Sequence, residues 1–112
     1  MWRDDAYLLD MLLASRKAQQ FTQGVIWEQF RSNELLQNAT MRQIQIIGEA
    51  ARKISPEFKE AHPVIPWHEI IGMRHRLVHD YFHTDPVRVW EVIEKDLPVL
   101  ISLIEPLVPP DE

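Results

Sequence analysis

The sequence predicts an all-α fold, and three observations support this. Apolar residues recur every three or four positions over most of the chain, which is the spacing of one helix face. No segment keeps the apolar–polar alternation of a half-buried strand, and Gly-Asn hairpin signals are missing. Pairs such as Ser55-Pro56 and Asp85-Pro86 are typical helix starts. We therefore expect an antiparallel up-and-down bundle of four to five helices.

The first half of the chain predicts two long helices. The first is expected from about Asp4 to Gln20, and residues 21–24 end it, before a short helix over 25–31. The second long helix is expected to begin near Asn33 and to end at Ser55-Pro56. Apolar positions separated by four, three, four and three residues give it one buried face, made of Thr40, Ile44, Ile47, Ala51 and Ile54.

Prolines divide the second half of the chain. A short helix follows Ser55 as its cap, and the pairs His62-Pro63 and Ile65-Pro66 then interrupt helical structure. A further helix is expected to restart near Trp67 and to continue to about Tyr81.

The last helix is expected to begin at Asp85-Pro86. Pro98 should kink or split it, because proline lacks the N–H group that would bond four residues back. Trp67 and Trp90 stand at helical spacing among apolar residues, so we assign both to core packing.

Length and composition indicate one soluble domain spanning residues 1–112. The chain is 46% apolar, has no cysteine, and contains no apolar run near the roughly 20 residues needed to cross a bilayer. Residues 1–5 lack the basic region of a secretory signal, so a cytoplasmic location is expected. The net charge of −5 disfavours broad, non-specific attraction to nucleic acid, so any RNA binding must use a local basic site or partner.

One segment of this acidic chain concentrates basic and titratable groups. Four of its five histidines fall there, interleaved with two arginines: His68, Arg74, His75, Arg76, His79 and His83. Three interpretations compete: cleavage of a phosphodiester, a metal site, and a solvated helix face without chemistry.

Metal-independent RNA cleavage needs a base for the ribose 2′-OH and a fixed cation for the charge that develops on phosphorus. Histidine, which titrates near neutral pH, and arginine, which is always charged, meet these needs. His79 and Arg74 would take these roles. On a continuous helix, five residues place the two side chains roughly 140° apart. That separation favours a site shared by two copies of the chain across a two-fold axis.

The other two interpretations stay open at this point. His75 and His79 are four residues apart and His83 extends the row, as in half of a zinc site. The glutamate of a His-Glu-x-x-His pair is absent, however, and Arg76 stands in its place, which disfavours a cation. Polar helices also carry arginine and histidine simply as a solvated face.

The segment Arg74 to Tyr81 resembles the motif of the HepT-like family in the HEPN superfamily. The family pattern is Arg, a polar residue, three further residues, His, any residue and Tyr, and His75 fills the polar position. The resemblance extends to three other segments in the same order, and so covers nearly the whole chain: residues 46–51, 65–72 and 89–93.

This resemblance implies a ribonuclease in which Arg74 and His79 are catalytic, and a homodimer whose two motifs line one cleft. It implies that Tyr81 receives AMP from a cognate MNT-type nucleotidyltransferase antitoxin. On a continuous helix Tyr81 would lie only about 20° from Arg74. His75 is a possible auxiliary residue. Glu49 is another, either orienting Arg74 through a buried ion pair or serving as a structural carboxylate.

The sequence therefore predicts a metal-independent endoribonuclease toxin without a cofactor, acting on RNA as a homodimer and controlled by an antitoxin. The alternative is a non-catalytic helical partner or binding subunit of a nucleotidyltransferase, which the acidic charge favours. A bundle that binds a small nucleotide is a third interpretation.

Overall fold

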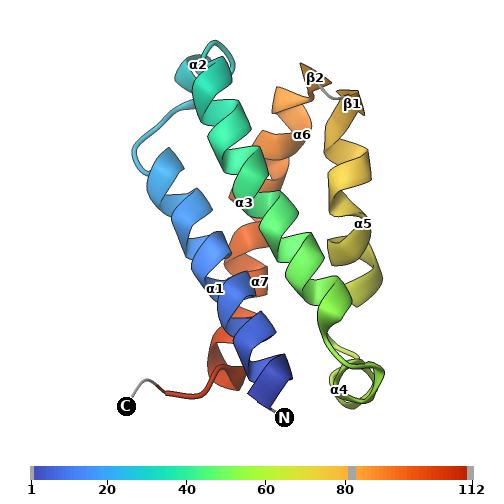
Figure 1. The fold of residues 1–112 in the computed structure, drawn as a ribbon. Helices are drawn as coiled ribbons and strands as arrows, with labels where there is room; N and C mark the ends of the chain where they lie inside the picture. Colours follow the sequence, from blue (N-terminus) through green and yellow to red (C-terminus); the bar gives the residue numbers. More distant parts are fainter. Residues whose placement is uncertain (1, 81–82, 111–112) are drawn as a thin grey trace.

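The computed structural model describes residues 2–80 and 83–110; for Trp2, Arg74, residues 78–80 and His83 it describes the backbone alone. Within these residues the chain is an all-α bundle of helical rods that alternate in direction, as predicted (Figure 1). The rods are α1 (Trp2–Thr22), α3 (Glu34–Lys53), α5 (Trp67–Leu77) and the continuous run of α6 (Pro86–Glu91), the π-helical turn η1 (Val92–Asp96) and α7 (Leu97–Ile104). Shorter elements join them: α2 (Trp27–Phe30), α4 (Pro56–Ala61), β1 (Val78–Asp80), β2 (His83–Thr84) and the 3-10 turn η2 (Glu105–Leu107).

Helix α3 is central to the bundle and packs against both α1 and α5. All five residues of its predicted apolar face are at most 2% exposed: Thr40, Ile44, Ile47, Ala51 and Ile54. The tryptophan assignments are also confirmed. Trp67 is buried, and the half-buried Trp90 has its ring centroid 5.0 Å from that of Phe30.

Polar side chains cap α3, α4 and α6, and the caps of α4 and α6, Ser55 and Asp85, are the ones that the sequence predicts. The Asn33 side chain accepts a hydrogen bond from the backbone N–H of Leu36 at 3.0 Å. The Ser55 hydroxyl accepts one from Phe58 N–H at 3.2 Å, which starts α4. Asp85 accepts hydrogen bonds from N–H groups in the first turn of α6. These caps satisfy donors that have no partner within their own helices.

The last rod is divided near Pro98, as predicted. The five residues 92–96 form a π-helical turn, in which Leu97 N–H bonds to the carbonyl of Val92. Pro98 then stands at the start of α7, where its missing N–H removes no helical hydrogen bond.

The expected extent of the motif helix is wrong, because α5 ends at Leu77 rather than near Tyr81. The Leu77 carbonyl accepts a hydrogen bond from Asp85 N–H at 2.7 Å, and residues 78–80 pair with β2 in an antiparallel ladder. Aromatic and β-branched residues dominate after Leu77, and their preference is for extended structure. Tyr81 itself lies outside the described residues.

None of the described helices is both long enough and apolar enough to span a membrane.

Candidate functional site

Helix α5 holds the motif against the centre of the bundle. Its apolar side is buried through Ile70, Met73 and Leu77. Its first turn is fixed by the Trp67 indole, which donates a hydrogen bond to the His62 carbonyl at 3.1 Å. The two helices approach closely at Gly48 of α3, where an added Cβ would lie 3.3 Å from the carbonyl oxygen of Ile70.

The two principal motif positions fall on different elements. The backbone of Arg74 belongs to the last turn of α5, whereas that of His79 belongs to β1. The ladder pairs Val78 with Thr84 and Asp80 with His83, so His79 is the extra residue of an irregular register. Bulges of this kind change the direction of a strand locally. The side chains of Arg74 and His79, and all of Tyr81, lie outside what the structure describes.

This arrangement overturns two geometric arguments made from the sequence. Both the 140° separation of Arg74 and His79 and the 20° separation of Arg74 and Tyr81 assumed one continuous helix, and α5 ends at Leu77. A shared site in a dimer therefore loses its support from helix geometry and rests on the family resemblance.

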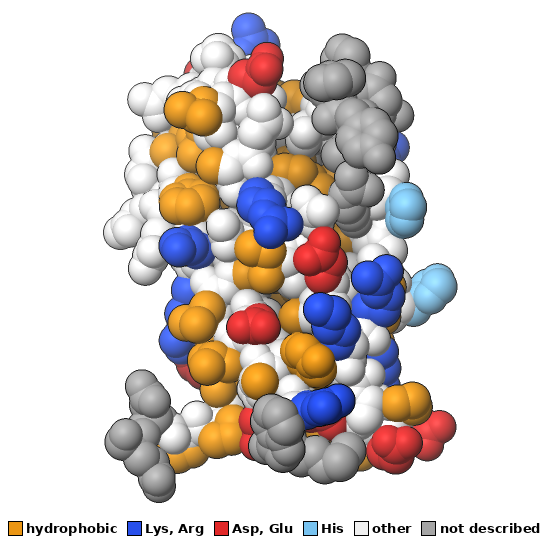
Figure 2. All heavy atoms as spheres, viewed as in Figure 1, with side chains coloured by type: hydrophobic (Ala, Val, Ile, Leu, Met, Phe, Trp, Pro, Cys, Tyr) orange, Lys and Arg blue, Asp and Glu red, His pale blue; other side chains and the backbone are white. Residues whose placement is uncertain are grey.

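The two auxiliary residues predicted from the sequence come together in one hollow between α3 and α5. His75 supplies the α5 side and Glu49 the α3 side of this space of about 200 Å³, called here the α3–α5 hollow. Its lining is mostly polar in character and comprises Gln45, Gly48, Glu49, Arg52, Ile71 and His75. Figure 2 shows Lys and Arg side chains gathered over α3 and toward α5 on this face, with histidines along the α5 edge.

Glu49 does not have the environment of a buried ion pair. It is exposed, and its carboxylate accepts a hydrogen bond from the Gln45 side-chain amide at 3.3 Å. The reason lies in its position on α3: residues 47 and 51 turn into the core, so residue 49 faces outward. Glu49 is therefore not buried, contrary to the expectation of a buried ion pair, and its pairing with Arg74 stays a prediction, since the Arg74 side chain lies outside what the structure describes.

Arg76 turns to the opposite side of α5 from His75. Its guanidinium donates a hydrogen bond to the Glu69 carbonyl at 3.2 Å and lines a second hollow, of about 270 Å³, between α5 and α7. That hollow is mainly apolar, with Ile70, Leu97 and Leu100 in its wall. His75 and Arg76, although adjacent in the motif, thus line two different hollows beside α5.

The histidine row that suggested a metal site is not formed on one helix. His75 lies in α5, while His79 and His83 belong to β1 and β2, and the side chains of these last two are not described. Among the side chains that are described, no three histidine, aspartate or glutamate residues group closely enough to hold a metal ion.

Sequence reasoning predicted Glu49 on the α3 side of this hollow but missed its neighbours on the same helix. Arg52 and Gln45 both line the α3–α5 hollow, and Gly48 lets α5 come close enough to complete it. A signal was available: Arg42, Gln45, Glu49 and Arg52 are spaced by three, four and three residues, and so form a polar stripe beside the apolar one.

The fold and the site together define a class: an all-α bundle in which an Arg-x4-His segment straddles the end of helix α5. The sequence model of the family described as ribonuclease HepT-like matches residues 11–107. The chain belongs to the HepT-like ribonuclease family.

Relatives of the chain carry names consistent with this family. It is 38% identical over 101 residues to "Probable ribonuclease HepT" of Thermococcus cleftensis, which covers 90% of this chain and 92% of that protein. It is 34% identical over 100 residues to "Putative RNase MJ1380" of Methanocaldococcus jannaschii, which covers 89% of this chain and 92% of that protein. No solved structure gives a significant match.

Proposed function

We propose that the protein is a metal-independent endoribonuclease and the toxin of a type II toxin–antitoxin pair of the HEPN/MNT kind. Membership of the HepT-like family supports RNA as the substrate. The observation that carries the proposal is the location of the Arg-x4-His segment. Arg74 stands on a helix docked against α3, and His79 follows two residues after that helix ends.

In the proposed reaction His79 takes the proton from a ribose 2′-OH, and the 2′ oxygen attacks the adjacent phosphorus. The bond from phosphorus to the 5′ oxygen breaks, which leaves a 2′,3′-cyclic phosphate, and the departing 5′ oxygen takes a proton from water. Arg74 stabilises the negative charge that builds up on the phosphate oxygens, since its planar group can contact two of them at once. Neither step calls for a metal ion or an organic cofactor.

The first test replaces each proposed catalytic residue singly. Arg74→Ala and His79→Ala should each lower the rate of RNA cleavage by about 100-fold or more, as expected for the loss of a charge-stabilising group or a general base. His68→Ala, which alters an exposed histidine at the other end of α5, is the matched control. Circular dichroism should show unchanged helix content in all three variants. Wild-type cleavage by either of the first two would refute the assignment.

Chelation separates the proposal from the metal interpretation. Cleavage should be the same with and without EDTA, since the proposed general base and cation both belong to the protein. Loss of activity in EDTA, restored by a divalent metal, would instead support the histidine row as a metal site.

A non-catalytic binding subunit is the alternative, and the acidic net charge of −5 favours it. The RNA cleavage assay also distinguishes these two functions. A binding subunit would leave RNA intact at every enzyme concentration, and Arg74→Ala and His79→Ala would then behave like the wild type.

We also propose control by an MNT-type nucleotidyltransferase that transfers AMP to Tyr81. The phenolic oxygen would attack the α-phosphate of ATP and release pyrophosphate, leaving an anionic nucleotide close in sequence to His79. Intact mass after co-expression with such an enzyme should increase by one or more AMP units in the wild type but not in Tyr81→Phe. An unchanged wild-type mass beside a demonstrably active transferase would exclude this control.

A further inference from the structure

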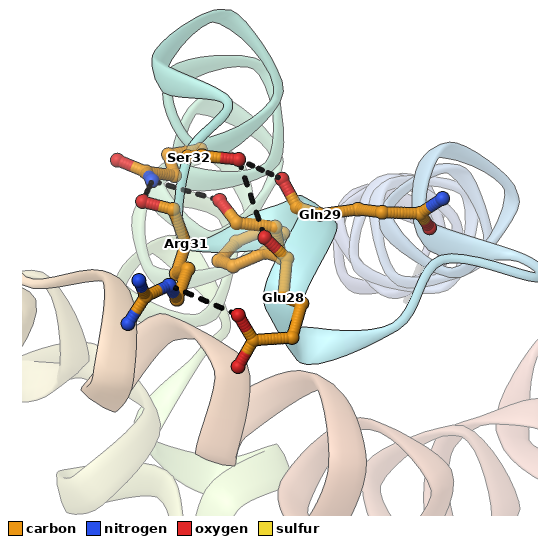
Figure 3. A network of polar contacts seen from close by, with 6 residues as sticks. Glu28, Gln29, Arg31 and Ser32 are labelled. Carbon is orange, nitrogen blue, oxygen red and sulfur yellow. Dashed lines mark hydrogen bonds and ion pairs between the residues drawn. The ribbon is translucent and has the colours of Figure 1, made fainter.

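Arg52, which lines the α3–α5 hollow, differs from three other arginines of the described surface in having no carboxylate partner. Arg31 pairs with Glu28 at 3.4 Å (Figure 3), Arg88 pairs with Asp85 at 3.3 Å, and Arg16 pairs with Glu105. Arg52, in contrast, pairs with no carboxylate among the described residues, although it is exposed and lines the hollow. Its charge is therefore available to a ligand.

Further positive charge gathers at the same end of α3. Lys53 follows Arg52 in the last helical turn, but its ammonium lies over the Tyr7 ring of α1, 5.9 Å from the ring centroid. The Lys59 ammonium of α4 donates a hydrogen bond to the Arg52 carbonyl at 3.3 Å. His75 stands on the opposite wall of the hollow. Within the hollow itself Arg52 supplies a fixed positive charge and His75 a titratable group, beside the carboxylate of Glu49. The fixed charge of Arg52 can hold a phosphate.

The remaining lining of the hollow is not that of a simple anion site. Gln45 and Glu49 lie one helical turn apart, and their side chains are hydrogen-bonded to each other at 3.3 Å. Ile71 adds an apolar surface. A carboxylate and an amide beside an apolar wall can receive the edge and the face of a nucleobase.

We propose that the α3–α5 hollow binds one nucleotide of single-stranded RNA next to the cleaved phosphodiester. Arg52 holds the backbone phosphate, and the Gln45–Glu49 pair contacts the base edge. His75 joins this subsite to the motif, because it adjoins Arg74 in sequence on α5. The assignment rests on the proposed ribonuclease function and adds to it a binding residue, Arg52, outside the Arg-x4-His segment.

The base edge that fits this pair carries an amino group. The Glu49 carboxylate can only accept hydrogen bonds, and the exocyclic amino groups of cytosine and adenine donate them, whereas uracil has no amino group. The subsite should therefore favour cytidine and adenosine over uridine.

The experiment measures binding without cleavage. Fluorescence anisotropy follows labelled 2′-O-methyl hexamers of adenosine, cytidine or uridine, which lack the attacking hydroxyl. Arg52→Gln should weaken binding of all three roughly tenfold and lower the slope of log Kd against log salt by about 0.7, as for one lost phosphate contact on a single strand. Arg16→Gln removes the same charge on α1, outside the hollow, and should leave both quantities unchanged.

Glu49→Gln tests the base contact. Its amide can donate to a uracil carbonyl, so it should narrow the preference for adenosine and cytidine over uridine. An unchanged preference would overturn the base-reading role of the Gln45–Glu49 pair. Equal affinities and equal salt slopes for Arg52→Gln and Arg16→Gln would overturn the subsite itself. Melting temperatures check that every variant is folded.

Cleavage of the matching RNA, run in parallel, separates this inference from the proposed function. If the wild-type protein binds the hexamers through Arg52 but cleaves no RNA, the result supports the subsite and refutes the ribonuclease function. If the wild-type protein cleaves RNA, and Arg52→Gln changes neither KM nor hexamer affinity, the result supports the ribonuclease function and refutes the subsite.

Discussion

Asp4 joins the first turn of α1 to the junction between α3 and α4. Its carboxylate is buried and accepts hydrogen bonds from the backbone N–H of Ser55 at 2.9 Å and from the Ser55 hydroxyl at 2.7 Å. Burial by itself would raise the pKa of Asp4, but the two hydrogen bonds, together with nearby positive charge such as that of Lys59, outweigh it and the pKa lies below its ordinary value. The charged form therefore stabilises the fold.

Asp4→Asn should lower the free energy of unfolding at pH 7 by about 1 to 3 kcal/mol, the usual range for a buried hydrogen bond to a charged group. Because the folded pKa is depressed, this contribution is present above the unfolded pKa and is lost as the pH falls through the folded value. Urea unfolding at pH 7 and in acid should show the gap between wild type and variant closing. Asp10→Asn, an exposed position on the same helix, is the control; equal effects of the two variants would contradict this account.

Residue-scale prediction from the sequence succeeded where the signal is local. The sequence predicts Ser55 and Asp85 as caps and a helix start near Asn33, because such signals act within three residues. The link between Asp4 and Ser55 could not be predicted in this way. The two residues are 51 positions apart, and only the packing of α1 against α3 brings them together.

At the scale of elements, the contact between α3 and α5 depends on Gly48. An added Cβ at this position would meet the Ile70 carbonyl at 3.3 Å and the Ile71 carbonyl at 3.6 Å, and both atoms are backbone. Gly72, in the middle of α5, would place a Cβ in open space. An alanine substitution at Gly72 therefore tests helix propensity alone, whereas one at Gly48 also tests the packing of α5 against α3.

Gly72→Ala should raise the free energy of unfolding by about 0.5 to 1 kcal/mol, because alanine is the better helix former. Gly48→Ala should fall short of that gain by about 1 kcal/mol or more, since α5 must move away from α3 to admit the methyl group. Urea unfolding of both variants gives the comparison. An equal gain in the free energy of unfolding from both variants would mean that the close approach of α5 does not restrict the side chain at position 48.

The elements of the bundle could be predicted well except around the motif. Thr40, Ile44 and Ile47 gave α3 a clear period, and burial of all three confirmed it. The motif helix was extended too far because Arg74 to Tyr81 was treated as one unit. The extended preference of the residues after Leu77 was present in the sequence, but a short strand pair also depends on its partner, here residues 83–84.

For the whole molecule, the sequence predicted the architecture but only half of the candidate site. A helical period fixes which face of each helix is buried, so an all-α bundle followed. The α3–α5 hollow combines residues 45–52 with residues 71–75, and its width depends on the approach at Gly48. The sequence predicts His75 and Glu49 as site residues but not Arg52, because Arg52 belongs to no motif.

A dimeric active site is tested on the assembled protein. If each site takes Arg74 from one copy and His79 from the other, mixing inactive Arg74→Ala with inactive His79→Ala should restore about one quarter of the wild-type activity, since half the dimers then hold one intact site. Native mass spectrometry should confirm that the chains exchange. A mixed dimer that forms and stays inactive would mean that each copy uses its own pair.

Because the ladder between β1 and β2 is short, the temperature at which activity is lost should lie below the temperature at which the helices melt. So small a strand pair is marginal by itself, and it should open at a lower free energy than the packed helices. Opening it would carry His79 away from the end of α5 while α1, α3 and α5 stay folded. On heating, cleavage should therefore fail reversibly below the temperature at which the helices melt, and cooling should return full activity without refolding.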